Sequence, residues 1–157
     1  MRGRYCLLAM LVLVSDQATK WIAQLSLQGA APIEIIPGFL RFRHVLNSGV
    51  AFGLFQESQA AWKPYVFAGM AAVAVVVILI FAARAPSSRR LLQVALAITM
   101  GGILGNFIDR VSRGVVADFV EFHIHEVFYW PTFNLADAAI TTGIALLLMD
   151  TLKNPAE

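Results

Sequence analysis

The sequence has few cysteines and few charged residues. Its single cysteine, Cys6, excludes an internal disulfide, and no cysteine–histidine pattern resembles a zinc site. Charged residues make up only 14% of the 157 positions, whereas a soluble domain has about 25%. The net charge is +2. Because the basic residues also do not cluster, we exclude a nucleic-acid-binding surface.

Apolar residues are abundant instead. They form 59% of the chain, and the mean hydropathy is +0.71, whereas soluble domains have about 45–50% apolar residues. The sequence therefore predicts an integral membrane protein, with residues 1–157 as a single domain. Arg2 and Arg4 followed by the apolar residues 5–14 resemble a signal peptide, but no small-x-small cleavage site follows. We interpret this segment as a retained first transmembrane helix.

Four segments are apolar enough to cross a membrane, which takes roughly 20 residues. They are residues 5–25, 65–83, 91–108 and 135–152. The second and third carry no charge. The first contains Asp16 and Lys20 and the fourth contains Asp137, so these side chains must face protein or water.

Basic residues predict the orientation of the helices, since cytoplasmic flanks are enriched in Lys and Arg. The residues that fall on one side are Arg2, Arg4, Arg84, Arg89, Arg90 and Lys153. We therefore expect both termini in the cytoplasm, and the connections 26–64 and 109–134 outside. These outer connections also contain basic residues, so the charge bias is modest.

The outer connections have strand-like patterns. Residues 39–45 and 115–123 alternate in part and contain aromatic and β-branched residues, with turn signals at Pro37-Gly38 and at 112–114 before them. The predicted fold class is an all-α membrane protein with a small β element, in which four transmembrane helices support a small extracytoplasmic sheet at the outer interface.

Several polar groups lie near the outer ends of the predicted helices. Asp16 and Lys20 are one helical turn apart, so they form either a self-neutralising pair with Lys20 extended toward the interface or a pair that supports a site. We favour the second interpretation, because ionisable residues inside a membrane usually have a functional role. Asn106, Asp109 and Arg110 form either a helix end or part of a site.

Other patterns have simpler interpretations. Gly101 and Gly105 predict close helix packing. Asn134 followed by Asp137 is typical of a helix amino-terminal cap. His123 and His125 would share one face of a strand, and two histidines alone are weak evidence for a metal.

Asp118 and Asp137 are the candidate catalytic pair. Asp118 lies within a predicted strand and Asp137 at the outer end of a helix, on the same side of the membrane and at similar depth. If they meet, repulsion and desolvation would keep one protonated and the other ionised. Such a pair supplies the acid and the base of an aspartyl protease.

Five motifs resemble signal peptidase II, the prolipoprotein signal peptidase family. In chain order they are Asp16-Gln-x-Thr-Lys20, Asn47-x-Gly-x-Ala-Phe-Gly53, Gly101-Gly-x-x-Gly-Asn-x-x-Asp-Arg110, Gly114-x-Val-x-Asp-Phe119 and Phe133-Asn-x-Ala-Asp-x-x-Ile140. They cover nearly the whole chain, and no motif position departs from the family pattern.

The resemblance implies an aspartyl endopeptidase with Asp118 and Asp137 as the catalytic dyad. It implies a set of residues that bind substrate or support the site: Asp16, Lys20, Asn47, Gly102, Asn106, Asp109, Arg110, Val116, Asn134 and Ala136. It also implies a diacylglyceryl-modified prolipoprotein as substrate, cleaved on the amino side of the lipidated cysteine, with membrane lipids as the surroundings. We expect no metal or organic cofactor, and a monomer.

Two other functions are compatible with membrane-embedded charge. A small proton-coupled carrier could use the acidic and basic residues as a path, although carriers place their sites near the midplane. A scaffold subunit that only packs would leave the two interfacial acids without a purpose.

Overall fold

The computed structural model describes residues 3–48, 62–86, 88–125 and 127–154. Its elements follow in the order α1 (Gly3–Leu27), β1 (Ile33–Ile36), β2 (Leu40–Asn47), α2 (Lys63–Arg84), α3 (Arg90–Arg113), β3 (Val116–Ile124), β4 (Phe128–Tyr129) and α4 (Leu135–Lys153). The four helices are long and apolar enough to cross a membrane. The predicted fold class is thus confirmed.

Helix α3 is the central helix and packs against α1, α2 and α4. Small residues allow the close approach, as the spacing of Gly101 and Gly105 predicted. A Cβ added at Gly101 would lie 2.6 Å from the Ala9 carbonyl oxygen on α1, and one added at Gly102 would lie 2.5 Å from the Ala136 carbonyl oxygen on α4. Near the amino end of α1, the apolar core brings together Tyr5, Ala9, Ile78, Ala82, Leu96, Ala97 and Met100.

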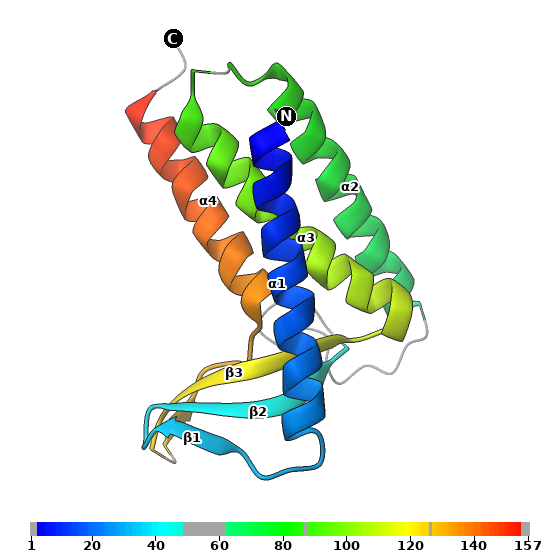
Figure 1. The fold of residues 1–157 in the computed structure, drawn as a ribbon, viewed down its shortest axis with the longest axis vertical. Coiled ribbons are helices and arrows are strands. Elements are labelled where there is room, and N and C mark those ends of the chain that lie inside the picture. Colours follow the sequence, from blue (N-terminus) through cyan, green and yellow to red (C-terminus); the bar gives the residue numbers. More distant parts are fainter. Residues whose placement is uncertain (1–2, 49–61, 87, 126, 155–157) are drawn as a thin grey trace.

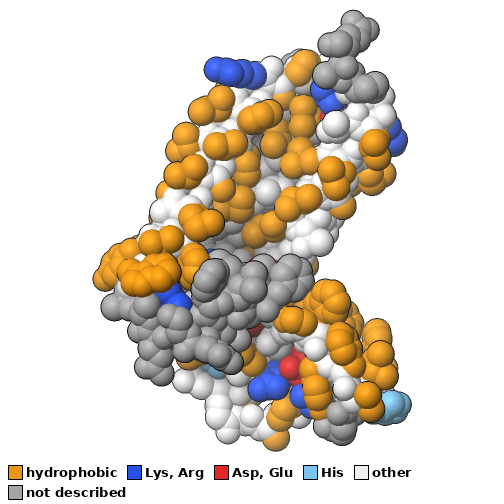
Figure 2. All heavy atoms as spheres, turned by 180° about the vertical axis from the view of Figure 1, so that it is seen from behind, with side chains coloured by type: hydrophobic (Ala, Val, Ile, Leu, Met, Phe, Trp, Pro, Cys, Tyr) orange, Lys and Arg blue, Asp and Glu red, His pale blue; other side chains and the backbone are white. Residues whose placement is uncertain are grey.

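The outward faces of the helices are apolar. Leu11, Val73, Phe81 and Leu148 are more than half exposed, and Figure 2 shows hydrophobic side chains over much of the helical surface. In water such a surface would be unfavourable, whereas lipid tails solvate it. The exposed residues therefore define the part of the protein that contacts the membrane.

The four strands form one sheet in the order β1-β2-β3-β4, and all neighbours are antiparallel. A turn at Pro37–Phe39, with Gly38 at φ 74°, joins β1 to β2, as predicted. The β2–β3 register is irregular between Phe42 and Val45, and it then sets Val45 opposite Asp118 and Asn47 opposite Val116. The sheet thereby presents Asn47 and Asp118 near the helix ends.

The sheet and the basic helix ends lie at opposite ends of the molecule. Figure 1 shows the start of α1, the end of α2, the start of α3 and the end of α4 at the end away from the sheet. Arg84 and Lys153 lie in the last turns of α2 and α4 there. This grouping is the one that the charge pattern predicted.

One predicted boundary is wrong. We expected the third helix to end near residue 108, whereas α3 continues to Arg113 and ends at Gly114 with φ 74°. The apolar pattern stops at Ile108, but the helix continues because the next carboxylate, Asp109, is paired inside the protein with Lys20. The turn predicted at 112–114 is thus the carboxyl-terminal end of a helix.

Candidate active site

Asp118 is held on β3, at the junction between the sheet and the helices. Its side chain is 1% exposed. Its Oδ2 accepts a hydrogen bond from Asn47 Nδ2 at 3.0 Å, and its Oδ1 accepts one from Asn134 Nδ2 at 2.7 Å. Both oxygens of the buried carboxyl group are thus satisfied, which fixes its orientation.

Asp137 lies in the first turn of α4, as part of the helix cap that the sequence predicted. The Asn134 side chain accepts from the Asp137 backbone N–H at 2.9 Å, and Asp137 Oδ2 accepts from the Asn134 backbone N–H at 3.2 Å. Asp137 Oδ1 accepts from Asn106 Nδ2 at 2.8 Å. The capping box therefore aims this carboxylate at α3 and holds it there.

Asn134 joins the two carboxyl groups, because it contacts both Asp118 and Asp137. Burial raises the pKa of Asp118 to about 7, and the charge of Asp137 contributes to this rise, while hydrogen bonds from Asn47 and Asn134 oppose it. Near neutral pH, Asp118 therefore takes up and releases a proton readily. The structure thus brings together the two acids that we predicted to meet.

Beneath these acids, Lys20 joins α1 to α3. Its Nζ lies 2.8 Å from Asp16 Oδ2, 2.8 Å from Asp109 Oδ2 and 2.8 Å from Asn106 Oδ1. Lys20 is 1% exposed, and both Asp16 and Asp109 are fully buried. The alternative in which Lys20 extends to the interface is wrong, because two carboxylates and an amide oxygen satisfy its charge inside the protein.

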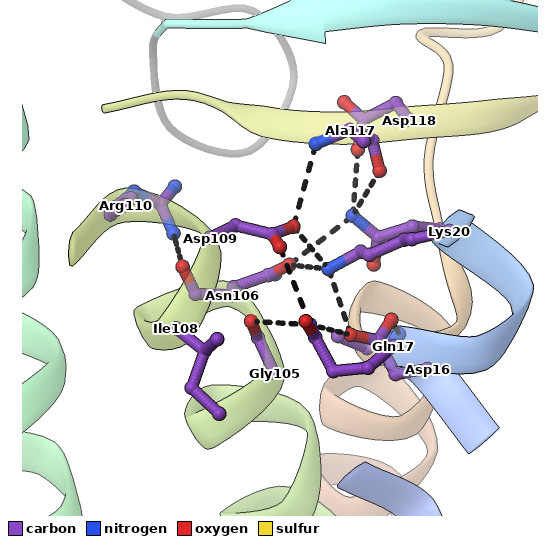
Figure 3. Close-up of polar contacts among 12 residues, drawn as sticks. Asp16, Gln17, Lys20, Gly105, Asn106, Ile108, Asp109, Arg110, Ala117 and Asp118 are labelled. Atoms are coloured by element: carbon purple, nitrogen blue, oxygen red, sulfur yellow. Dashed lines mark hydrogen bonds and ion pairs between the residues drawn. The ribbon is translucent and has the colours of Figure 1, made fainter. Parts of the chain in front are cut away.

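Figure 3 shows how these groups converge from α1, α3 and β3. Gln17, which we had not singled out, also takes part. Its Nε2 lies 3.1 Å from the Gly105 carbonyl oxygen, 3.2 Å from Asp16 Oδ2 and 3.3 Å from Asp109 Oδ1. Its place beside Asp16 in the first motif was the only signal in the sequence.

The acidic residues of this cluster also tie the backbone together. Asp16 Oδ1 accepts from the Ala136 N–H at 2.8 Å, and Asp109 Oδ2 accepts from the Ala117 N–H at 3.5 Å. Ala136 is fully buried, and Gly105 has no room for a side chain because a Cβ there would meet Asp16. The cluster therefore sets the positions of α4 and β3, the two elements that carry Asp137 and Asp118.

A cavity of about 630 Å³ opens beside Asp137. Its polar lining residues include Asn47, Asn106, Arg110, Thr132, Thr141 and Thr142, and Val116 also contributes to the lining. The rest of the lining is largely apolar: Phe122, Trp130, Pro131, Phe133, Ala138, Ile140 and Ile144. Such a cavity fits an extended peptide or an acyl chain whose reacting group lies beside Asp137.

Of the candidate residues, the structure gathers Asp16, Lys20, Asn106, Asp109, Asp118, Asn134 and Asp137 into one hydrogen-bonded network. Asn47 contacts the network through Asp118, and Arg110 Nη1 donates to the Asn106 carbonyl oxygen at 3.2 Å. Gly102 lies where α3 packs closely against α4. The second motif lies outside the described residues from Gly49 onward.

The prediction that His123 and His125 share one strand face is wrong. His125 follows the end of β3 with φ 45°, so it does not share a strand face with His123. His123 is buried, and its ring contacts the His125 carbonyl oxygen at 2.8 Å and Glu34 at 3.1 Å, whereas His125 is exposed. Among the described residues, no three His, Cys, Asp or Glu side chains converge as metal ligands.

Comparison with known proteins identifies the family. Residues 8–153 match the family model described as signal peptidase (SPase) II. The lipoprotein signal peptidase of Acinetobacter baylyi is 38% identical over 144 residues, which cover 92% of this chain and 79% of the relative. The enzyme of the same name from Symbiobacterium thermophilum is 40% identical over 142 residues, 90% of each chain.

Two solved structures of bacterial membrane enzymes have the same fold. One superposes with a TM-score of 0.85 and 31% identity, covering 99% of this chain and 92% of the other. The second has a TM-score of 0.84 and 32% identity, with coverages of 98% and 96%. Sequence and fold agree along almost the whole length, and this multi-pass membrane protein therefore belongs to the signal peptidase II family of aspartic peptidases.

Proposed function

We propose that the chain is a single-domain membrane endopeptidase that removes the signal peptide from diacylglyceryl-modified bacterial prolipoproteins. The cut falls on the amino side of the lipidated cysteine. Lipoprotein signal peptidases at 38% and 40% identity support the substrate class. The largely apolar cavity that includes Asp137 in its lining supports a substrate with both a peptide and acyl chains.

Asp118 and Asp137 act as the catalytic dyad. The contacts of Asn134 support this role most directly. Asn134 donates both to the buried Asp118 on β3 and to the half-buried Asp137 on α4. One carboxylate removes a proton from the attacking water, while the protonated partner donates to the carbonyl oxygen of the scissile bond. The same pair then returns a proton to the leaving amine.

Other residues hold the substrate and the dyad in place. Asn47 and Asn134 donate to Asp118, and Asn106 donates to Asp137. Arg110 and Val116 line the cavity near Asp137. The pair of acids supplies both proton transfers, so the enzyme uses no metal and no organic cofactor.

The active site faces the outer side of the cytoplasmic membrane, and both termini are in the cytoplasm. The basic residues at the end away from the sheet support this orientation, because cytoplasmic flanks are enriched in Lys and Arg. The proposal also includes a monomeric enzyme.

The test is cleavage of a diacylglyceryl-modified prolipoprotein in detergent, followed by gel shift. Asp118→Asn and Asp137→Asn should each abolish cleavage, and the double variant should lose little more, because groups that act as a unit are not additive. EDTA should leave the wild-type rate unchanged. Full activity in either single variant, or loss of activity with EDTA, would overturn the mechanism.

A further inference from the structure

The Asn106 side chain links the buried Lys20 to Asp137. Its Nδ2 donates to Asp137 Oδ1 at 2.8 Å, while its Oδ1 accepts from Lys20 Nζ at 2.8 Å. An amide has a donor end and an acceptor end, so these two contacts hold only in one orientation. Rotation by half a turn would direct the amide nitrogen at the ammonium and the amide oxygen at the carboxylate.

Lys20 is the dominant influence on that orientation. The second donor to Asn106 Oδ1 is Asn134 Nδ2, at 3.2 Å. This nitrogen has two hydrogens for three nearby acceptors, since it also lies 2.7 Å from Asp118 Oδ1 and 3.4 Å from the Ala117 carbonyl oxygen. The Lys20 contact is shorter and charge-assisted, and it lies in a site excluded from water, where such bonds are strongest.

The other amide of the site is fixed differently. Asn134 Oδ1 accepts from the backbone N–H of Asp137 as the cap of α4, so the helix itself sets the direction of the Asn134 amide. Asn106 lies within α3, where no backbone group performs that task. The orientation of the donor to Asp118 thus depends on helix geometry, and that of the donor to Asp137 depends on a charge.

We infer that Lys20 is a positioning residue for the reaction: its ammonium fixes the Asn106 amide so that this amide donates to the Asp137 carboxylate. The inference rests on the proposed function in one respect, the catalytic role of Asp137. Charge neutralisation alone does not explain Lys20. The cluster of Lys20, Asp16 and Asp109 contains two carboxylates and keeps a net charge of −1 with the ammonium present.

A specific pH dependence follows. The charged groups that act on Asp137 are Lys20 on α1, Arg110 on α3 and Asp118 on β3. Asp16 on α1 and Asp109 on α3 reach this group through Lys20. Without the Lys20 contact, only the longer bond from Asn134 still holds the Asn106 oxygen, so the amide N–H stabilises the singly ionised dyad less well. The acid limb of the kcat–pH profile then moves to higher pH, while KM for the lipidated peptide stays the same.

The decisive variant separates orientation from charge. Lys20→Met combined with Asp16→Asn keeps the net charge of the cluster at −1, and the amide oxygen introduced by the second substitution can still accept from the Ala136 N–H. We expect a folded, monodisperse protein with kcat reduced by up to about 100-fold and the acid limb shifted upward. Lys153→Met, which changes an exposed lysine at the far end of α4, is the control and should match wild type.

A double-mutant cycle with Asn106→Ala tests the route of action. If Lys20 acts through Asn106, the Lys20→Met/Asp16→Asn change should have almost no further effect on kcat in the Asn106→Ala background. Additive losses, an unmoved acid limb, or recovery of wild-type kcat in the charge-preserving variant would overturn the inference. If the wild type cleaves no lipidated peptide, or Asp137→Asn keeps full activity, the proposed function fails instead.

Discussion

Asp118 should lower the stability of the folded protein at neutral pH, so that replacing it should stabilise the enzyme while abolishing its activity. Its carboxyl is 1% exposed, and burial, reinforced by the charge of Asp137, raises its pKa from 3.8 to about 7. The unfolded chain releases this proton near pH 4, whereas the folded protein holds it until about pH 7. Between these values unfolding releases a proton, and stability falls as the pH rises.

The size of the effect follows from the difference in pKa. The difference between about 7 and 3.8 is roughly three units, and each unit corresponds to about 1.4 kcal/mol. The ionised form of Asp118 thus costs at most about 4 kcal/mol at pH 8. An asparagine has nearly the same shape and cannot ionise. Its oxygen can still accept from Asn134, and the Asn47 amide must turn so that its own oxygen accepts from the new Nδ2.

The assay is thermal unfolding of Asp118→Asn and wild type in the same detergent, from pH 4 to pH 8, monitored by tryptophan fluorescence. The two proteins should unfold at similar temperatures at pH 4. The variant should gain on the order of 10 °C by pH 8, at roughly 2–4 °C per kcal/mol for a chain of this size. A difference that is independent of pH, or a variant that is less stable at pH 8, would refute the reasoning.

Two further predictions concern packing and orientation. Gly102→Ala should lower the free energy of unfolding by about 1–3 kcal/mol, because the new Cβ would lie 2.5 Å from the Ala136 carbonyl oxygen. The control is Gly69→Ala, whose new Cβ would have nothing within 4 Å, and it should be neutral or stabilising in the same thermal assay. The orientation can be tested by thiol labelling in a Cys6→Ser background, because Gln28 and Ser88 are both exposed and lie at opposite ends of the helices. Gln28→Cys should react with an impermeant thiol reagent from outside the cell, and Ser88→Cys only from the cytoplasm. The reverse pattern would contradict the orientation.

The helices were predictable because their signal is local. Each transmembrane segment is a run of apolar residues, and the turn at Gly38 and the cap at Asn134 also have local signatures. For the end of α3 we followed the apolar run and interpreted Gly114 as a loop turn, although a glycine after a basic last turn also signals a helix end. The continuation past Ile108 depends on Lys20, more than eighty positions earlier in the chain, which pairs with Asp109.

The short strands escaped prediction for a similar reason. β1 has four residues and β4 has two, and both are stable only beside longer strands, β2 and β3. Runs this short carry too little periodicity to be distinguished from loop.

Some parts of the candidate site could likewise be predicted from the sequence, and others could not. Asp118 and Asp137 could be identified as candidates by residue type, depth and motif, and the structure places them against a common partner. The part played by Gln17 depends on the packing of α1 against α3, which no spacing in the sequence encodes. The direction of each hydrogen bond is likewise a property of the assembled network.

The double use of Asn134 has a consequence for biosynthesis. The same side chain starts α4 and holds Asp118, so the dyad cannot exist before the last helix has formed and docked against α3. A newly inserted chain that still lacks α4 has Asp118 but not Asp137. Under the proposed mechanism such a chain should not cleave, and proteolytic activity should require the completed bundle.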